Sequence, residues 1–171
     1  RVIADKMGML ATLMNGLALT DHMRQNGIDV EIYHSSSIDG VVEPYNRDSA
    51  RARLDAGEVV VLTGGTGNPF FTTDTAACLR AIELGVEAVL KATSVDGVYS
   101  ADPTKNKDAN RYETLDISEI LEKELGVIDM TAAVLCKENN MPLQVVDSRT
   151  PGWMSKVIEG DPVGTIVHPN E

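Results

Sequence analysis

The chain has 171 residues and a mass of 18.4 kDa, which fits one domain of ordinary size. It carries 15 Lys and Arg residues against 26 Asp and Glu residues. The resulting net charge of −11 argues against binding to nucleic acid polymers or membrane surfaces, because both need a basic footprint. A hydrophobic share of 43% and a charged share of 24% are typical of a globular protein and exclude the disordered class.

Apolar residues at helical spacing predict a long first helix over residues 7–26. Asp5 lies just before this segment and Gly27 just after it, as expected for a helix start and a helix end. The apolar residues cover more than one stripe of the helix. We therefore expect it to be buried on more than one side, in the middle of the domain or at a subunit interface. The apolar stretch at residues 7–19 is predicted to be too short to span a bilayer.

The rest of the chain alternates short apolar strands with helices. Strands are predicted at residues 28–34, 59–62, 88–90, 143–146 and 165–167, and helices at residues 46–56, 74–84, 117–125, 130–139 and 153–158. Continuous apolar runs are typical of parallel strands that are covered on both faces. The alternation predicts a layered α/β fold with a mostly parallel sheet. Ligands of such sheets bind beyond the carboxyl ends of strands, which points to the loops after Leu62 and Leu90.

The first of these loops, at residues 64–69, has the sequence Gly-Gly-Thr-Gly-Asn-Pro. Glycines let backbone amides approach a ligand closely, and the amides at the start of the following helix favour anions. The spacing matches neither the dinucleotide-binding fingerprint nor a Walker sequence. A tight turn, with Thr72 or Thr73 capping the next helix, explains the pattern equally well.

The two phenylalanines of the chain, Phe70 and Phe71, follow this loop directly. They either form a hydrophobic plug that anchors the loop or form a wall for a planar base. The hydroxyl groups of Thr72 and Thr73 could read the polar edges of such a base, cap the helix, or do both.

The second loop follows a buried strand that Lys91 closes, where a cation is costly unless it is paired or liganded. Phosphoryl transfer needs such cations to balance the charge of the transferring group. Tyr99 could stack on a purine, and Asp102 could accept from ribose hydroxyls. A polar loop with an Asp-Pro turn is the alternative. Asp5 is likewise either a partner of the helix dipole or an acceptor for a ribose diol.

No cluster of metal ligands is evident in the sequence, and the three histidines are scattered with no hydrolase order. Cys78 and Cys136 lie far apart, each inside a helical pattern, and are expected to be buried packing residues. Two cysteines without a disulfide framework favour a reducing cytoplasm.

Several segments, in order along the chain, resemble one known family. They are Asp-Lys-Met-Gly-Met-Leu-Ala-Thr at residues 5–12, Gly-Thr-Gly-Asn-Pro-Phe-Phe-Thr-Thr-Asp at 65–74, Leu-Lys-Ala-Thr at 90–93, Val-Asp-Gly-Val-Tyr at 95–99 and Asp-Pro at 102–103. From residue 1 to residue 165 the chain is similar to the bacterial uridylate kinases of the amino-acid kinase superfamily. The Gly-Asn-Pro-Phe-Phe-Thr-Thr-Asp segment is highly specific, whereas Val-Asp-Gly-Val-Tyr is shared more widely.

The resemblance implies a three-layer αβα sandwich with a mainly parallel central sheet, the amino-acid kinase (acetylglutamate kinase-like) fold. Residues 1–171 would form one domain, roughly the C-terminal two-thirds of the family's domain, with the N-terminal strands missing. The implied reaction transfers the γ-phosphoryl group of ATP, bound with Mg²⁺, to UMP and gives UDP and ADP. The resemblance also implies a cytoplasmic hexamer built of dimers that takes part in pyrimidine nucleotide biosynthesis and responds to GTP and UTP.

The resemblance assigns roles to residues that match the family's motifs. The residues implied to bind UMP are Asp5, Thr66, Gly67, Asn68, Pro69, Phe70, Phe71, Thr72 and Thr73. Those implied to bind ATP are Thr93, Tyr99 and Asp102. Lys91 would be a local electrostatic helper of catalysis, and no residue is expected to hold a metal by itself.

The chain departs from the family in two ways. The family's first-strand Lys-Leu-Ser-Gly loop and its Gly-Gly-Gly-Asn loop with an arginine are absent from these 171 residues, and Glu87 stands where the family usually has Asp. We therefore expect the 171 residues alone to be a poor catalyst, because charge stabilisation and positioning supply most of this catalysis. A non-catalytic nucleotide-binding or assembly subunit is the alternative. A third hypothesis is that the phosphoryl acceptor is a carboxylate or a carbamate. The Phe-Phe-Thr-Thr segment at residues 70–73 argues against it.

Overall fold

The computed structural model describes residues 1–101, 105–106 and 108–169 of the chain. The sequence predicts one domain, and within it the contacts cluster in two compact units, Arg1–Ala76 and Ala77–Glu171.

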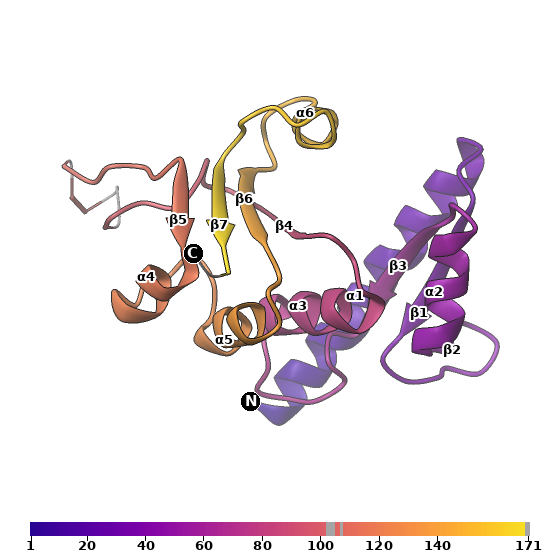
Figure 1. Ribbon diagram of the computed structural model, residues 1–171. Helices are drawn as coiled ribbons and strands as arrows, with labels where there is room; N and C mark the ends of the chain where they lie inside the picture. The colour runs from indigo at the N-terminus through magenta and orange to yellow at the C-terminus, as the bar shows by residue number, and fades with distance from the viewer. Residues whose placement is uncertain (102–104, 107, 170–171) are drawn as a thin grey trace. The chain divides into compact units, whose positions relative to one another are not determined.

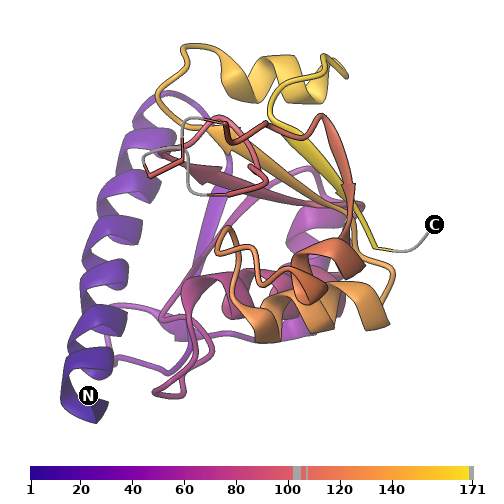
Figure 2. The ribbon, with the colours of Figure 1, turned by 90° about the vertical axis from the view of Figure 1, so that its left-hand side faces the viewer.

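The first unit contains a parallel sheet of three strands between two helices. The elements follow the order α1 (Val2–Gln25), β1 (Val30–His34), β2 (Glu43–Pro44), α2 (Arg47–Asp55) and β3 (Val59–Thr63). The strand order is β2-β1-β3, and both pairs are parallel. Both helices contact β1 and β3 from opposite faces of the sheet (Figures 1 and 2). This unit therefore has the three layers that the resemblance implies.

Helix α1 packs on the sheet through a small residue. A Cβ atom added at Gly16 would collide with a side-chain carbon of Thr63 and lie 3.1 Å from Ile32. Leu13 and Thr20, on the same face, are buried as well. The absence of a side chain at Gly16 thus sets how closely helix and sheet approach.

Helix α1 corrects three expectations. It begins at Val2, so Asp5 lies inside its first turn, and Arg1 is the N-cap without a side-chain bond. Its outer surface is not covered within the first unit, since Ile3, Met7 and Met14 are each at least 65% exposed. This is against a position in the middle of the domain, whereas a position at a subunit interface stays a prediction.

The stretch that was predicted to be too short for a bilayer, residues 7–19, is only part of this helix, which has 24 residues. By length and composition α1 could cross a membrane. One such helix near an N-terminus is weak evidence for a span, because core helices and signal sequences have the same character.

The second unit contains a mixed sheet of four strands. Its elements are α3 (Thr73–Leu84, whose first turn belongs to the first unit), β4 (Val89–Thr93), β5 (Thr114–Asp116), α4 (Ile117–Glu122), α5 (Met130–Glu138), β6 (Leu143–Asp147), α6 (Trp153–Ile158) and β7 (Thr165–His168). The strand order is β4-β6-β7-β5, in which only the β6–β7 pair is antiparallel. Helices α4 and α5 lie side by side (Figure 1).

The core of the second unit is formed by α4, α5 and the inner faces of the strands. Ile117, Ile120, Cys136, Val145 and Val167 are completely buried there. The Sγ atoms of Cys136 and Cys78 are 3.3 Å apart, and both residues are free thiols. The prediction that both cysteines are buried packing residues is confirmed.

Each unit has its own sheet, in which β3 and β4 are edge strands. The mainly parallel strand order that the sequence predicts is found in both units, since only the β6–β7 pair is antiparallel. An apolar run indicates that a strand is covered, but it does not identify the strand with which it pairs.

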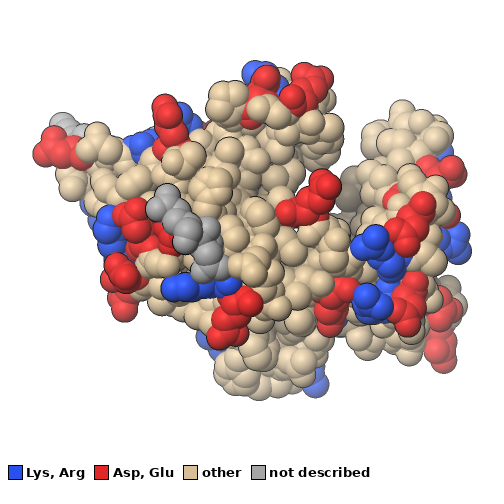
Figure 3. All heavy atoms as spheres, viewed as in Figure 1, with Lys and Arg blue, Asp and Glu red and all other residues tan. Residues whose placement is uncertain are grey.

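The charged side chains on the face shown in Figure 3 are mixed in sign. Over α2 the arginines lie beside carboxylates, as in the ion pairs of Arg51 with Asp55 and of Arg53 with Glu58. This face therefore offers no basic patch to a polyanion.

Candidate functional site

The first unit joins the start of α1 to the loop after β3. The backbone N–H of Phe70 donates a hydrogen bond of 2.8 Å to Oδ2 of Asp5. Arg1 lies 3.4 Å from the same carboxylate oxygen, and its guanidinium stands 5.3 Å from the centre of the Phe70 ring. Residues 65 positions apart in the sequence therefore form one cluster, as the resemblance implies.

The carboxyl group of Asp5 is held in its charged form. The hydrogen bond from the Phe70 backbone, and after it the bond and charge of Arg1, lower the pKa of Asp5 below its ordinary value of 3.8. A carboxylate has about four lone-pair positions, so Asp5 can accept bonds from a ligand besides those from Phe70 and Arg1.

The glycines of the loop adopt conformations that other residues rarely adopt. Gly64, Gly65 and Gly67 have φ angles of 79°, 60° and 79°. The Gly64 N–H donates a bond of 2.9 Å to Oγ1 of Thr12 on α1, and the Gly67 N–H donates one of 3.1 Å to the Gly64 carbonyl. The loop is thus folded tightly and tied to α1 at a second point.

Thr66 and Asn68 bond to one another across Gly67. The Asn68 N–H donates to Oγ1 of Thr66 at 3.1 Å, and the Asn68 side chain donates to the Thr66 carbonyl at 3.3 Å. Pro69 follows and is half-buried. These bonds fix the loop, while Gly67 and Asn68 themselves remain exposed.

The phenylalanines do not anchor the loop. Phe70 is 63% exposed and Phe71 is 51% exposed, so the interpretation as a hydrophobic plug was wrong for this unit. Phe70 also has a φ angle of +75°, a strained conformation for a bulky residue. Strained backbone conformations are often found at functional sites. The exposed rings of Phe70 and Phe71 are also accessible to a ligand.

The two threonines after the phenylalanines begin α3. Oγ1 of Thr72 accepts a bond of 3.2 Å from the Thr75 N–H, so the capping prediction for Thr72 is confirmed. Thr73 is the first residue of the helix. Both threonines are exposed next to the helix N-terminus, where backbone N–H groups favour an anion.

The second unit brings the carboxyl ends of β4 and β6 together. Thr93 and Asp147 are partners in the parallel register of these strands. The Thr93 carbonyl accepts bonds from the N–H (2.8 Å) and hydroxyl (3.0 Å) of Ser148. Lys91 is half-buried and lies within β4, two residues before the strand ends, whereas the sequence predicts it at the end.

Arg149 holds this edge together. Its Nε and Nη2 atoms bind the two carboxylate oxygens of Asp147 at 2.9 and 2.8 Å, and Nη2 also donates to the Ser94 carbonyl at 2.6 Å. The bonds from the Arg149 side chain and backbone lower the pKa of Asp147 to about 2. This ion pair was not predicted from the sequence.

Tyr99 is held by the loop after β4. Its hydroxyl donates a bond of 2.8 Å to Oδ1 of Asp96, which raises the pKa of Tyr99. Arg111 donates to the Asp96 carbonyl at 3.0 Å. Asp102, the other predicted ribose contact, lies outside the described residues.

Five functional or supporting residues were not found from the sequence: Arg1, Thr12, Asp96, Asp147 and Arg149. Asp147 had a usable signal, because it directly follows an apolar strand, and Thr12 and Asp96 lie inside segments that carry the family resemblance. The roles of Thr12 and Arg149 depend on contacts with Gly64 and Ser94, which are 52 and 55 positions away. Within the described part of the chain, no group of three or more His, Cys, Asp or Glu side chains could hold a metal ion.

Comparisons with known proteins agree with this geometry. The family model described as "Amino acid kinase family" matches residues 1–147. The uridylate kinase of Legionella pneumophila (strain Paris) is 55% identical over 170 residues, which cover 99% of this chain and 69% of that protein. The uridylate kinase of strain Corby is 54% identical with the same coverage.

Solved structures give the same result. The UMP kinase from Bacillus anthracis superposes with a TM-score of 0.96 at 36% identity, over 100% of this chain and 71% of that chain. The UMP kinase from Ureaplasma parvum gives 0.92 at 35% identity, over 98% and 72%. The resemblance found in the sequence is thus confirmed, and the chain belongs to the amino acid kinase family, with uridylate kinases among its relatives.

Proposed function

We propose that this protein is a nucleoside monophosphate kinase that transfers the γ-phosphoryl group of MgATP to UMP, giving UDP and ADP. The observation that carries the proposal is the bond between Asp5 and the Phe70 backbone, which joins two family segments in one cluster. The uridylate kinases of Legionella, 54–55% identical to this chain, support the same activity. They disfavour the alternative of a non-catalytic subunit.

In this proposal UMP binds to the first unit. The Asp5 carboxylate accepts hydrogen bonds from the ribose hydroxyls, and the exposed rings of Phe70 and Phe71 contact the pyrimidine base. Thr66, Gly67, Asn68 and Pro69 shape the loop around the nucleotide. The hydroxyls of Thr72 and Thr73 read its polar groups at the start of α3.

ATP is proposed to bind to the second unit. Thr93 and Tyr99 contact its adenosine part, with Asp102 as the further expected contact. The Asp96 bond keeps the Tyr99 ring in one orientation. Mg²⁺ enters with the ATP phosphates as part of the substrate, and Lys91 adds positive charge near the phosphoryl group.

Assembly and location extend the proposal. The exposed apolar side chains of α1, among them Met7, Leu10 and Met14, support self-association, for which a hexamer of dimers is the family expectation. The free thiols of Cys78 and Cys136 fit a reducing cytoplasm. A role in pyrimidine nucleotide synthesis follows from the proposed formation of UDP. Regulation by GTP and UTP stays an expectation.

Steady-state kinetics of a variant tests the proposal, because KM is measured for UMP and for ATP separately. Replacing Asp5 by Asn should raise KM for UMP at least tenfold and leave KM for ATP within twofold. Asp21→Asn is the matched control, because Asp21 lies on the same helix about 24 Å further along. An unchanged KM for UMP in the Asp5→Asn variant would contradict the assignment.

A further inference from the structure

His34 is a buried titratable residue that the proposed reaction does not use. It is the last residue of β1 and only 2% exposed, whereas His22 and His168 are exposed. Burial lowers the pKa of His34 below its ordinary value of 6.5, so the imidazole is neutral at pH 7. A neutral imidazole has one N–H donor and one acceptor nitrogen, and the neighbouring groups decide which nitrogen carries the hydrogen.

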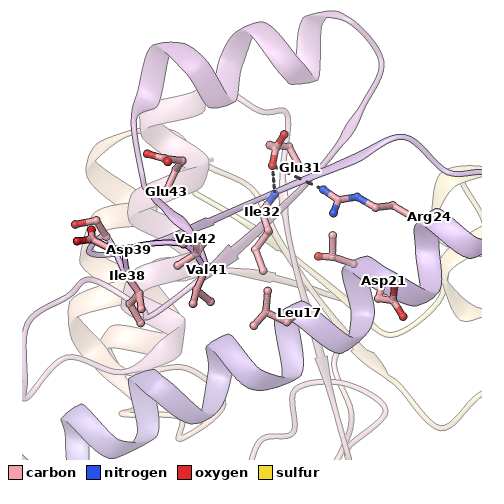
Figure 4. A pocket seen from close by; sticks show the side chains of 13 residues that line it. Leu17, Asp21, Arg24, Glu31, Ile32, Ile38, Asp39, Val41, Val42 and Glu43 are labelled. Carbon is pink, nitrogen blue, oxygen red and sulfur yellow. Dashed lines mark hydrogen bonds and ion pairs between the residues drawn. The ribbon is translucent and has the colours of Figure 1, made fainter.

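The His34 side chain faces α1. Figure 4, a view of the pocket beside the C-terminal half of α1, shows Ile32 of β1 pointing toward Leu17 of α1. Alternate residues of a strand point to the same face of the sheet, so His34 shares this face with Ile32. The Thr63 side chain faces α1 as well, because a Cβ atom added at Gly16 would collide with it. His34 and Thr63 therefore lie on the same face of neighbouring strands.

Thr63 determines which nitrogen of His34 carries the hydrogen. Nδ1 of His34 lies 3.0 Å from Oγ1 of Thr63, its register partner at the end of β3. The Thr63 hydroxyl donates its own hydrogen to the Tyr33 carbonyl at 3.1 Å. Because a hydroxyl has only one hydrogen, Oγ1 accepts from His34, and this bonding pattern assigns the imidazole hydrogen to Nδ1. Two consecutive hydrogen bonds thus join the ends of β1 and β3.

The loop proposed to bind UMP begins directly after Thr63 and packs on the His34 ring. Gly64 has a φ angle of 79°, and a Cβ atom added there would lie 2.7 Å from Nδ1 of His34 and would collide with the Ser35 hydroxyl. A Cβ atom added at Gly67 would lie 3.1 Å from Cβ of Ser35. The loop backbone therefore rests closely on the last residue of β1 and on the residue after it.

The peptide group between Thr63 and Gly64 is held on both sides. Its carbonyl accepts a bond of 3.1 Å from the Ser35 N–H, and its N–H donates a bond of 2.9 Å to Oγ1 of Thr12 on α1. His34 adds a bond to the side chain of Thr63. Together these bonds set the direction in which the loop leaves β3.

From these contacts we infer that His34 is a positioning residue for UMP, which acts through Thr63 and Gly64 to fix the loop of residues 64–69. The inference rests on the proposed binding of UMP to this loop. His34 does not touch the nucleotide in this account, because it is buried under the loop backbone. It acts on binding because groups that contact a ligand must be held within about 0.5 Å of their productive positions.

Two replacements of equal size separate the hydrogen bond from packing. Asn retains an N–H donor at the place of Nδ1, whereas Leu has the same number of side-chain heavy atoms as Asn and no donor. His34→Leu should raise the dissociation constant of UMP, measured by calorimetry, at least fivefold and leave that of ATP within twofold. His34→Asn should stay within twofold for both nucleotides. Equal effects of the two variants on UMP binding would overturn the inference.

Val30→Ala is the control for a general loss of stability. Val30 is buried at the opposite end of β1, so its truncation should lower the melting temperature through the cavity that it leaves. The dissociation constant of UMP should nevertheless stay within twofold of that of the unaltered protein. A loss of UMP binding as large as that of His34→Leu would show that lowered stability explains both, and it would overturn the inference.

Two measurements without nucleotide separate this inference from the proposed kinase activity. The nitrogen chemical shifts of the His34 ring should show the hydrogen on Nδ1. Amide hydrogen exchange at Gly64 should be at least tenfold faster in His34→Leu than in His34→Asn. Hydrogen on Nε2, or equal exchange in the two variants, would overturn the inference. If both results are as expected and the unaltered protein does not bind UMP, His34 is supported as the residue that positions the loop, and the proposed function is contradicted.

Discussion

The Phe70 amide donates its hydrogen to the Asp5 carboxylate at 2.8 Å, across 65 positions of sequence. The bond holds the strained Phe70 backbone in place. It also favours the ionised form of the carboxyl group that is proposed to bind the ribose. Both effects have measurable consequences.

The first prediction concerns pH. The folded pKa of Asp5 lies below its ordinary value of 3.8, so its ionised form stabilises the loop above pH 3.8 and the contribution is lost as pH falls through the lowered pKa. UMP binding, measured by calorimetry, should therefore not weaken through Asp5 between pH 7 and pH 5. The Asp5→Asn variant should bind UMP more weakly throughout that range. A steep loss of affinity near pH 6 that disappears in this variant would contradict the account.

The second prediction concerns Thr12, whose hydroxyl accepts from the buried Gly64 amide at 2.9 Å. Thr12→Val leaves that amide without a partner and should cost about 1–3 kcal/mol of unfolding free energy. It should also raise KM for UMP, because the loop loses its second tie to α1. Thr12→Ser retains the hydroxyl and should recover most of both effects in denaturant unfolding and steady-state kinetics. Equal behaviour of the Val and Ser variants would show that the bond is unimportant.

The third prediction compares two glycines of α1. Gly16→Ala places a methyl group against Thr63 and Ile32 and should destabilise the protein by about 1–3 kcal/mol through overpacking. A Cβ at Gly8 meets nothing within 4 Å, so Gly8→Ala should stabilise the helix by about 0.5–1 kcal/mol. Urea unfolding of both variants measures the difference. A destabilised Gly8→Ala variant would contradict the packing of α1 described above.

The fourth prediction concerns the ion pair of Asp147 and Arg149. The folded pKa of Asp147 is about 2, so this carboxylate contributes stability above pH 3.8 that is lost as pH falls from 3.8 through about 2. Asp147→Asn should lower the melting temperature at pH 7 and flatten its decline in that acid range. Arg149→Lys should lower the melting temperature at pH 7 nearly as much as Asp147→Asn does. The reason is that Lys cannot bind both carboxylate oxygens and the Ser94 carbonyl together. An Arg149→Lys variant as stable as the unaltered protein would contradict this prediction, because it would show that the positive charge alone matters.

The sequence predicted the site loops better than it predicted their surroundings. The loops after β3 and β4 were found because apolar runs mark buried strands and ligands bind beyond their carboxyl ends. The pairing of β4 with β6, which brings Arg149 to Ser94, depends on contacts 55 residues apart that no local pattern encodes.

The misplaced features have physical reasons as well. The start of α1 was set too late because the helical periodicity was read only from Met7, and Asp5 was taken as a signal outside the helix. Phe70 and Phe71 were open to two interpretations, because hydrophobicity indicates a preference for burial but does not show what covers a side chain. Their exposure in the first unit favours the interpretation as a wall for a ligand.

The central claim is that UMP is the phosphoryl acceptor. The most direct measurement compares transfer from radiolabelled MgATP to UMP, AMP and glutamate by the purified protein. The ratio of the rates is the readout, because it does not depend on how fast the protein turns over. The account predicts labelled UDP with kcat/KM at least tenfold higher for UMP than for the other acceptors. Equal transfer to all three, or transfer to glutamate without UDP formation, would contradict it.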